Sequence, residues 1–424
     1  MKEKSGILIL LIALTINTGN YAQKKLKTKE QLTKATTYRS LEDAMLNKKR
    51  VYILNLDSKN LTELPAEIGK LKNLQELYLR GNKLTSLPPE LWELKNLQKL
   101  MIGDNQLSEI PATISNLINL EELDLFSNHL KSIPDAVTQL THLKKLYLNW
   151  NQLETLPADI GKLKELESLQ LDKNRLKSLP VSIGSLTRLK ELTLFRNQLE
   201  ALPSSIGNLK DIKELSVAEN NLQSIPSELG NMTTLTKLNL EKNKLTSIPE
   251  ELSSLKNLEI LNLSNNKIKA IKGNDINLPS LKELNLSINA ISVLSFNSDK
   301  LTSLKKLDLE LNRIKIPDNV YHISSLTYLN LAHNRIERIE SGIGNLIDLK
   351  QLYLDNNAIY SVSISIGKLS NLEYADLSNN KILLLQRQIA GMKKLTELNL
   401  ENNKISPFQQ QLIKKFLPNT KVHF

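Results

Sequence analysis

Leucine and asparagine recur along the chain at a fixed interval. Each recurring asparagine is preceded by a Leu-x-x-Leu-x-Leu-x-x pattern, as in Leu74, Leu77, Leu79 and Asn82. Successive asparagines are 23 residues apart, except for one 22-residue step after Asn312, and they stand at positions 82, 105, 128, 151, 174, 197, 220, 243, 266, 289, 312, 334, 357, 380 and 403. Such an interval predicts a stack of one repeated structural unit.

The Leu-x-Leu alternation within each unit has the period of a strand. It places both leucines on one side, which becomes core, and the residues around them on the other. After the asparagine come an apolar residue and Leu-Pro, as in Leu84, Leu87 and Pro88, and then apolar residues at steps of three. That spacing suits 3-10 turns, and proline cannot donate to a continuing ladder. We expect a parallel concave sheet and short 3-10 or extended segments on the convex side.

The recurring asparagine is expected to be structural rather than catalytic. One coil cannot close a hydrophobic core, whereas stacked coils bury one another's leucines in columns. The asparagine stands where the chain bends inward. Its amide can donate to and accept from backbone groups that have left the strand ladder.

The repeated pattern is similar to the signature of leucine-rich repeats. The phrase Leu-Pro-x-x-Ile-Gly-x-Leu, at residues 64–71, 156–163 and 202–209, resembles bacterial leucine-rich-repeat proteins akin to the Ras-suppressor and plant disease-resistance type of repeat. The resemblance implies an α/β fold: a right-handed solenoid, or horseshoe, with a parallel concave sheet, short 3-10 or helical convex segments and helical end caps. It also implies a protein-binding module without enzymatic activity, whose partner is set by variable surface residues.

The beginning of the chain has the pattern of a secretory signal peptide over residues 1–22. Lys2 and Lys4 precede an apolar run over residues 7–16, and a short polar stretch leads to Ala22, where we expect cleavage. The apolar run is too short to span a bilayer, and no later segment is long enough. We therefore expect an extracytoplasmic protein, in the periplasm, at the cell surface or secreted, with no membrane span.

Three further segments follow the signal peptide. Residues 23–50 are expected to form a flank with a cap helix, residues 51–405 sixteen repeats of about 23 residues, and residues 406–424 a cap helix and a last strand. The Leu-Pro pair disappears after Pro249. The 22-residue step indicates either a hinge near residues 313–319 or a one-residue deletion in a convex loop.

Aromatic and varied residues gather at outward strand positions in the front half of the array. Large rigid side chains with polar neighbours are typical interface anchors, so we expect a protein-binding face on repeats 2 to 8. The alternative is that these aromatics only stabilise cross-strand pairs. The predicted contact residues are Tyr78, Met101, Asp124, Phe126, Tyr147, Asn149, Trp150, Gln170, Asp172, Thr193, Phe195 and Arg196. A weaker second cluster contains Tyr328, Tyr353 and Tyr374, with His333 nearby.

Charge separates this face from the rest of the chain. The whole chain has a net charge of +11, but its outward strand positions hold fifteen anions and five cations. Such a face would repel a phosphate backbone, so we expect a neutral or basic protein ligand and no nucleic acid. The lysine-rich flank either contacts an anionic lipid or glycan or is a solvated, frayed end.

The sequence contains no recognisable catalytic or metal-binding motif. It lacks a Gly-x-x-x-x-Gly-Lys-Ser/Thr loop, a His-Glu-x-x-His helix and a Gly-x-Ser-x-Gly elbow, and it has no cysteine. We expect no catalytic residues, no metal and no cofactor. Trp92, which replaces the usual glycine, is expected to cover a convex-side gap.

Two functions are compatible with these patterns. The first is an exported, monomeric, non-enzymatic module that binds a protein through the concave face of repeats 2 to 8. The alternative is a cell-envelope adhesin or structural protein that binds glycan or an anionic surface.

Overall fold

The computed structural model describes residues 26–272, 276–295, 297–315 and 317–424. The expected signal peptide, its cleavage position and the first lysines of the flank lie outside these residues. The chain divides into two units, Met1–Ala35 and Thr36–Phe424. The described part of the first contains helix α1 (Lys29–Thr33), which begins after Thr28 with a capping box formed with Gln31.

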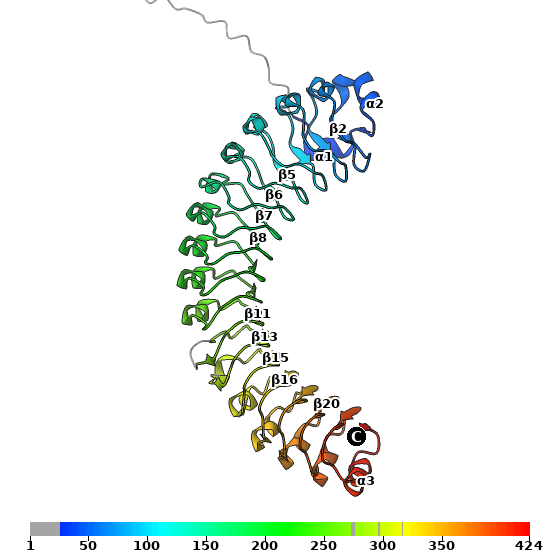
Figure 1. Ribbon diagram of the computed structural model, residues 1–424, viewed down its shortest axis with the longest axis vertical. Coiled ribbons are helices and arrows are strands. Elements are labelled where there is room, and N and C mark those ends of the chain that lie inside the picture. Colours follow the sequence, from blue (N-terminus) through cyan, green and yellow to red (C-terminus); the bar gives the residue numbers. More distant parts are fainter. Residues whose placement is uncertain (1–25, 273–275, 296, 316) are drawn as a thin grey trace, which may run out of the picture. The chain divides into compact units, whose positions relative to one another are not determined.

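The second unit is a stack of coils that share one parallel sheet. Within the described residues the sheet has eighteen strands, and Figure 1 shows them on the inner side of the arc formed by these coils. The strands are β1 (Thr37–Tyr38), β2 (Ile53–Asn55), β3 (Glu76–Tyr78), β4 (Lys99–Met101), β5 (Glu122–Asp124), β6 (Lys145–Tyr147), β7 (Ser168–Gln170), β8 (Glu191–Thr193), β9 (Glu214–Ser216), β10 (Lys237–Asn239), β11 (Ile260–Asn262), β13 (Glu283–Asn285), β15 (Lys306–Asp308), β16 (Tyr328–Asn330), β18 (Gln351–Tyr353), β20 (Tyr374–Asp376), β21 (Glu397–Asn399) and β22 (Lys421–His423).

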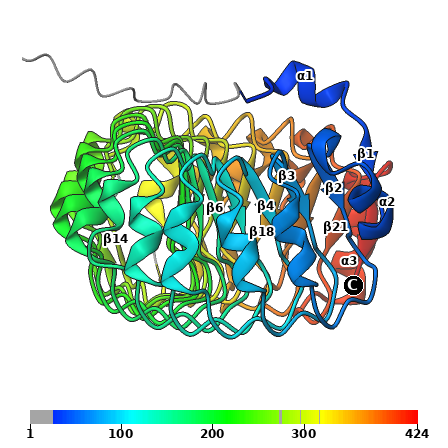
Figure 2. The same cartoon turned by 90° about the horizontal axis from the view of Figure 1, so that it is seen from above.

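Short 3-10 helices lie on the outer side of this unit, and successive coils overlie one another when viewed from above (Figure 2). They are η1 (Lys48–Arg50), η2 (Ala66–Lys70), η3 (Pro89–Glu93), η4 (Ala112–Asn116), η5 (Asp135–Gln139), η6 (Ile160–Lys162), η7 (Val181–Ser185), η8 (Ser204–Asn208), η9 (Ser227–Asn231), η10 (Glu250–Ser254), η11 (Ser298–Lys300), η12 (Asp318–His322), η13 (Ser341–Asn345), η14 (Ile364–Lys368) and η15 (Arg387–Gly391). The concave parallel sheet and the convex 3-10 segments are confirmed.

The core is one continuous stack of leucine columns. Leu77 pairs with Leu100, and Leu100 pairs with Leu123, in register between neighbouring strands. These side chains are completely buried, and one hydrophobic cluster continues from Ala44 to Leu417. Each coil therefore buries the apolar face of its neighbours, so stability is shared along the array.

The recurring asparagine bonds backbone groups of its own coil and of the preceding coil. In Asn197, Nδ2 donates to the carbonyl oxygens of Leu171, at 2.9 Å, and Leu194, at 3.2 Å, while Oδ1 accepts the N–H of Leu176 at 3.1 Å. The same arrangement recurs at Asn82, where Oδ1 accepts the N–H of Leu61 at 3.0 Å. Its structural role follows from these bonds.

We expect Asn197→Ala to lower the free energy of unfolding by about 1–3 kcal/mol, because one N–H and two carbonyl groups lose a buried partner. Denaturant unfolding followed by circular dichroism measures the change. Asn208→Ala, at an exposed position in η8, is the control and should leave the midpoint unchanged. Equal stability of the two variants would contradict a structural role for the asparagine.

The residue before each asparagine adopts a left-handed backbone conformation. Among the described residues Gly81 is the one glycine with positive φ, and the same turn in later coils holds residues such as Trp150, with φ 58°, Arg196, with φ 59°, and Ile288, with φ 52°. Positive φ is unusual for bulky side chains. This turn directs the chain from the strand into the position where the asparagine receives its bonds.

Loss of the Leu-Pro pair is accompanied by a second ladder on the outer side. The pairs β12 (Ala270–Ile271) with β14 (Val293–Leu294), and β17 (Arg338–Ile339) with β19 (Ser361–Val362), form two small parallel sheets there. Ser295 stands at the position of the earlier prolines, and its N–H donates to the carbonyl oxygen of Ile271 at 2.9 Å. A proline cannot make this bond, so the bond is confined to coils that lack proline at this position.

Glycine in the 3-10 helices lets neighbouring coils approach closely. A Cβ at Gly184 would lie 2.1 Å from the carbonyl oxygen of Ser205 in the next coil. Trp92 takes the corresponding place in η3 and is 2% exposed, as expected for a side chain that fills a convex-side gap. Helix η3 packs less closely on η4 than η7 packs on η8. The larger side chain is accommodated by this looser packing.

Helices close both ends of the stack. Helix α2 (Leu41–Leu46) begins after Ser40, whose hydroxyl accepts the N–H of Asp43. Helix α3 (Pro407–Phe416) begins after Ser406. Beyond it β22 pairs with β21. The sequence did not predict β1, which adds a strand before β2.

The sheet continues through the 22-residue step. Strands β15 and β16 pair in register, with Leu307 opposite Leu329. Oδ1 of Asn334 still accepts the N–H of Ile314, at 3.0 Å. The missing residue is therefore taken up outside the sheet, although residue 316 itself lies outside the described residues.

Candidate protein-binding face

The predicted contact residues lie on the inner side of the sheet. Tyr78, Met101, Asp124, Tyr147, Gln170 and Thr193 are the last residues of β3 to β8. The leucine before each of them is buried, so these side chains point away from the core. Phe126, Asn149, Asp172 and Phe195 follow two residues later, and Trp150 and Arg196 occupy the left-handed turn.

Two of these residues are not accessible, and their predicted direct contact with a ligand is corrected. Met101 is 2% exposed and Asp124 is 1% exposed. The guanidinium of Arg80 reaches across one whole coil, and its Nε lies 2.5 Å from Oδ2 of Asp124. Oδ1 of Asp124 accepts the N–H of Phe126 at 2.9 Å. Asp124 is therefore a partner for Arg80 rather than an open contact.

Gly103 leaves the space for this ion pair. It stands in the intermediate coil, at the strand position that Arg80 and Phe126 occupy in their own coils. A Cβ there would lie 2.9 Å from Oδ2 of Asp124. The role of Arg80 was not predicted from the sequence, in which the glycine between Arg80 and Asp124 is the available signal.

A hollow of about 340 Å³ lies beside this ion pair. Eight residues line it. Five are predicted contact residues, Asp124, Phe126, Tyr147, Asn149 and Gln170, and the other three are Arg80, Asp104 and Glu122. The carboxamide oxygen of Asn149 is buried and has no hydrogen-bond partner among the described residues. An unpaired buried acceptor is costly, so the fold alone does not account for Asn149.

Trp150 is the most exposed aromatic side chain of this face, at 50%. Its ring makes an edge-to-face contact with Phe126, with centroids 6.5 Å apart. Nζ of Lys173 lies 3.3 Å from the centre of the Trp150 ring. A bulky residue with positive φ and half of its surface in solvent contributes little to the core, which favours a role in binding.

Tyr147 and Phe195 are half-buried along the same face. Burial raises the pKa of the Tyr147 phenol above its usual value, and the carboxylate of Glu122 adds to this effect. Burial also raises the pKa of Asp172, whose Oδ1 accepts the N–H of Phe195 at 2.7 Å. The rings of Tyr147 and Phe195 are thus partly exposed and partly buried.

The second tyrosine cluster is a stack across three coils. The rings of Tyr328 and Tyr353 have centroids 5.4 Å apart, and those of Tyr353 and Tyr374 are 5.3 Å apart. Burial raises the pKa of Tyr328 and of Tyr374 to about 12, so both phenols stay protonated at neutral pH.

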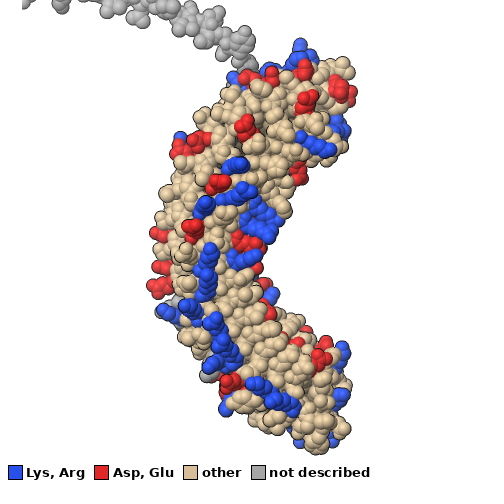
Figure 3. Space-filling model, viewed as in Figure 1, with Lys and Arg blue, Asp and Glu red and all other residues tan. Residues whose placement is uncertain are grey.

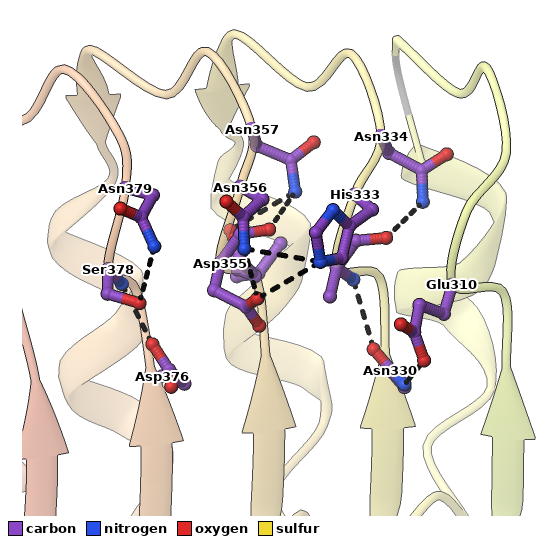
Figure 4. A network of polar contacts seen from close by, with 12 residues as sticks. Glu310, Asn330, His333, Asn334, Asp355, Asn356, Asn357, Asp376, Ser378 and Asn379 are labelled. Atoms are coloured by element: carbon purple, nitrogen blue, oxygen red, sulfur yellow. Dashed lines mark hydrogen bonds and ion pairs between the residues drawn. The ribbon is translucent and has the colours of Figure 1, made fainter.

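A polar network lies at the ends of the same strands (Figure 4). Nδ2 of Asn356 lies 3.2 Å from Nε2 of His333 and donates to Oδ2 of Asp355 at 2.8 Å. These bonds satisfy the side chains within the protein. The structure thus joins His333 to Asp355 and Asn356 rather than to the tyrosine rings.

The inner face remains acidic because cations on it are already paired with carboxylates. Lys99 lies 3.1 Å from Glu122, and Lys237 lies 2.6 Å from Glu214. Among the described residues no group of three or more His, Asp or Glu side chains could hold a metal ion. No helix in the described ranges is long and apolar enough to cross a membrane.

Family models match most of the second unit. The model of a leucine-rich repeat region matches residues 46–152 and 129–318. Models of leucine-rich repeats also match residues 324–365 and 347–405. No curated protein matches the chain.

Solved structures share the fold over most of the chain. A leucine-rich-repeat protein of Leptospira interrogans is 38% identical, with a TM-score of 0.79 over 92% of this chain and 100% of that one. The plant peptide hormone receptor RGFR1, solved in complex with RGF2, is 28% identical, with a TM-score of 0.69 over 89% of this chain and 65% of that one. An internalin of Listeria monocytogenes is 26% identical, with a TM-score of 0.59 over 80% of this chain and 90% of that one.

Proposed function

Because the chain belongs to the leucine-rich-repeat family, we propose that it is an exported, monomeric and non-enzymatic module that binds a protein ligand. The ligand docks on the concave face of repeats 2 to 8, the coils that contain β3 to β9. The similarity to a peptide hormone receptor that was solved with RGF2 supports a ligand of this class. Export rests on the sequence pattern of residues 1–22.

Trp150 carries this proposal. Its half-exposed ring stands at a turn where positive φ makes a bulky side chain unfavourable, and the hollow beside Phe126, Tyr147 and Asn149 lies next to it along the sheet. Large aromatic side chains beside a recess are typical anchors of protein interfaces. The acidic surroundings favour a neutral or basic ligand and disfavour a nucleic acid.

Trp150→Gly separates binding from folding. Glycine tolerates positive φ, so we expect thermal stability to stay equal or rise slightly. The immobilised mature Trp150→Gly variant should no longer capture its specific partner from extracellular proteins. Crosslinking and mass spectrometry measure this capture.

Ile288→Gly is the matched control, because Ile288 occupies the same turn in a later coil and is 46% exposed. It should gain the same backbone freedom while keeping the partner. Retention of the partner by Trp150→Gly, or equal loss by both variants, would contradict the proposed face.

The alternative function is a cell-envelope adhesin or structural protein that binds glycan or an anionic surface through the aromatic face and the basic flank. A variant in which Lys27, Lys29, Lys34, Lys48 and Lys49 are replaced by Gln distinguishes the two, because it removes the charge of the flank and keeps the cap helix α2. If this variant still captures the protein partner but no longer sediments with isolated cell wall, the flank binds the cell wall, as the alternative function requires. Unchanged sedimentation would leave the concave face as the binding surface.

A further inference from the structure

Six cations line one edge of the stack, where each coil leaves the inner sheet. They are Lys244, Lys267, Lys269, Arg313, Lys315 and Arg335, called here the basic edge, and all six are exposed. Figure 3 shows Lys and Arg side chains following an edge of the coils. This edge is distinct from the concave face, whose outward strand positions are acidic.

Backbone hydrogen bonds hold these positions in register. The N–H of Lys267 donates to the carbonyl oxygen of Leu245 at 2.8 Å, and the N–H of Arg313 donates to that of Ile291 at 2.9 Å. The N–H of Arg335 donates to the carbonyl oxygen of Ile314 at 2.9 Å. Neighbouring coils joined in this way are about 4.8 Å apart, so the cations follow one edge in two groups, separated by the coil that has Ala290 and Ser292 at these positions.

The charges of the basic edge are not neutralised by the protein. None of the six side chains forms a salt bridge within the parts of the chain that the structure describes. The loops at residues 244–249, 267–272, 290–295 and 313–317 contain no acidic residue, whereas the loop that begins at Arg335 contains Glu337 and Glu340. Unpaired like charges so close together repel one another, and an anionic ligand relieves that repulsion.

At the opposite edge, where the chain enters each strand, four lysines form salt bridges with glutamates. Lys144 lies 2.8 Å from Glu121, Lys190 lies 2.8 Å from Glu167, and Lys282 lies 2.8 Å from Glu259. Lys350 lies 3.3 Å from Glu373. These four lysines of the entry edge are paired with carboxylates, whereas the six cations of the basic edge form no salt bridge within the described residues.

We propose that the basic edge binds an acidic polysaccharide lying along the stack. A row of cations one or two side chains wide, interrupted at one coil, matches a linear chain that carries charges along its length. The four loops named above contain no aromatic side chain on which bases could stack, which disfavours single-stranded nucleic acid. The concave face stays free, so this site adds to the protein ligand rather than competing with it.

Binding to immobilised heparin and polygalacturonate tests the proposal with the full mature chain. The edge variant combines Lys244→Gln, Lys267→Gln, Arg313→Gln and Arg335→Gln. We expect its affinity to fall at least about tenfold at about 0.15 M NaCl. The slope of log affinity against log salt should decrease by about 3, since each lost contact contributes about 0.7.

The control variant combines Lys144→Gln, Lys190→Gln, Lys282→Gln and Lys350→Gln, which removes the same number of charges from the paired edge. Its affinity should stay within about twofold of the original. An equal loss of affinity in the two variants would show that binding depends on net charge alone, and would overturn the proposal. So would unchanged binding by the edge variant.

Vesicles of phosphatidylglycerol and a DNA duplex test the other anionic partners. We expect the edge variant to differ from the original protein more on the polysaccharides than on either of these. A loss seen on vesicles or duplex but not on the polysaccharides would overturn the assignment to a polysaccharide.

Discussion

Gly207→Ala is expected to lower the free energy of unfolding by about 3 kcal/mol, at the upper end of the usual cost of overpacking. A Cβ at this position would lie 2.1 Å from the carbonyl oxygen and 2.7 Å from the carbonyl carbon of Glu228. Both atoms belong to the main chain, so no side-chain rotation relieves the contact. Helices η8 and η9 would have to separate.

Gly342→Ala is the matched control in η13. There the nearest atoms are Cβ and Cδ2 of Tyr321, both at 3.2 Å, and they belong to a side chain. We expect a change below about 1 kcal/mol, because the ring can adjust slightly. Denaturant midpoints and hydrogen exchange of the amides in the two coils measure both effects. A similar small change in both variants would show that close helix contact does not set the coil spacing.

Simultaneous replacement of Phe126, Tyr147, Trp150 and Phe195 by alanine should abolish capture of the protein partner. These rings supply most of the aromatic area on the front half of the concave face, and truncating several interface anchors commonly costs more than 2 kcal/mol of binding free energy for each hot spot. The circular dichroism melt should move only slightly, because all four side chains face away from the leucine core.

The second tyrosine cluster provides the control for this variant. Tyr328, Tyr353 and Tyr374 lie on the same sheet, and replacing all three by alanine removes a comparable aromatic area. If the ligand docks on repeats 2 to 8, this triple variant keeps the partner. Loss of capture only in the triple variant would move the site to the back of the array.

The repeated sequence predicted the strands, the buried leucines and the role of the asparagine because each depends on residues within one or two coils. Leu77 is buried whatever stands at the outward positions of its coil. The bonds of Asn197 likewise require only the backbone of the coil before it. Such local features recur with the interval itself and can be read from it.

Accessibility on the concave face could not be predicted in the same way. Asp124 occupies an outward position, but Arg80, two coils earlier, covers it across Gly103. Asp124 is covered because the Arg80 side chain is long and Gly103 has no side chain. Met101 is also buried, although its strand position faces outward.

The two outer sheets make the array mechanically uneven. Coils in the front half are joined by the inner ladder and by loop bonds, such as that from the N–H of Lys83 to the carbonyl oxygen of Leu61. The coil pairs at residues 270–271 with 293–294 and at 338–339 with 361–362 add an outer ladder, so separating them must break further backbone hydrogen bonds. The binding face proposed on repeats 2 to 8 lies in coils that precede both outer sheets.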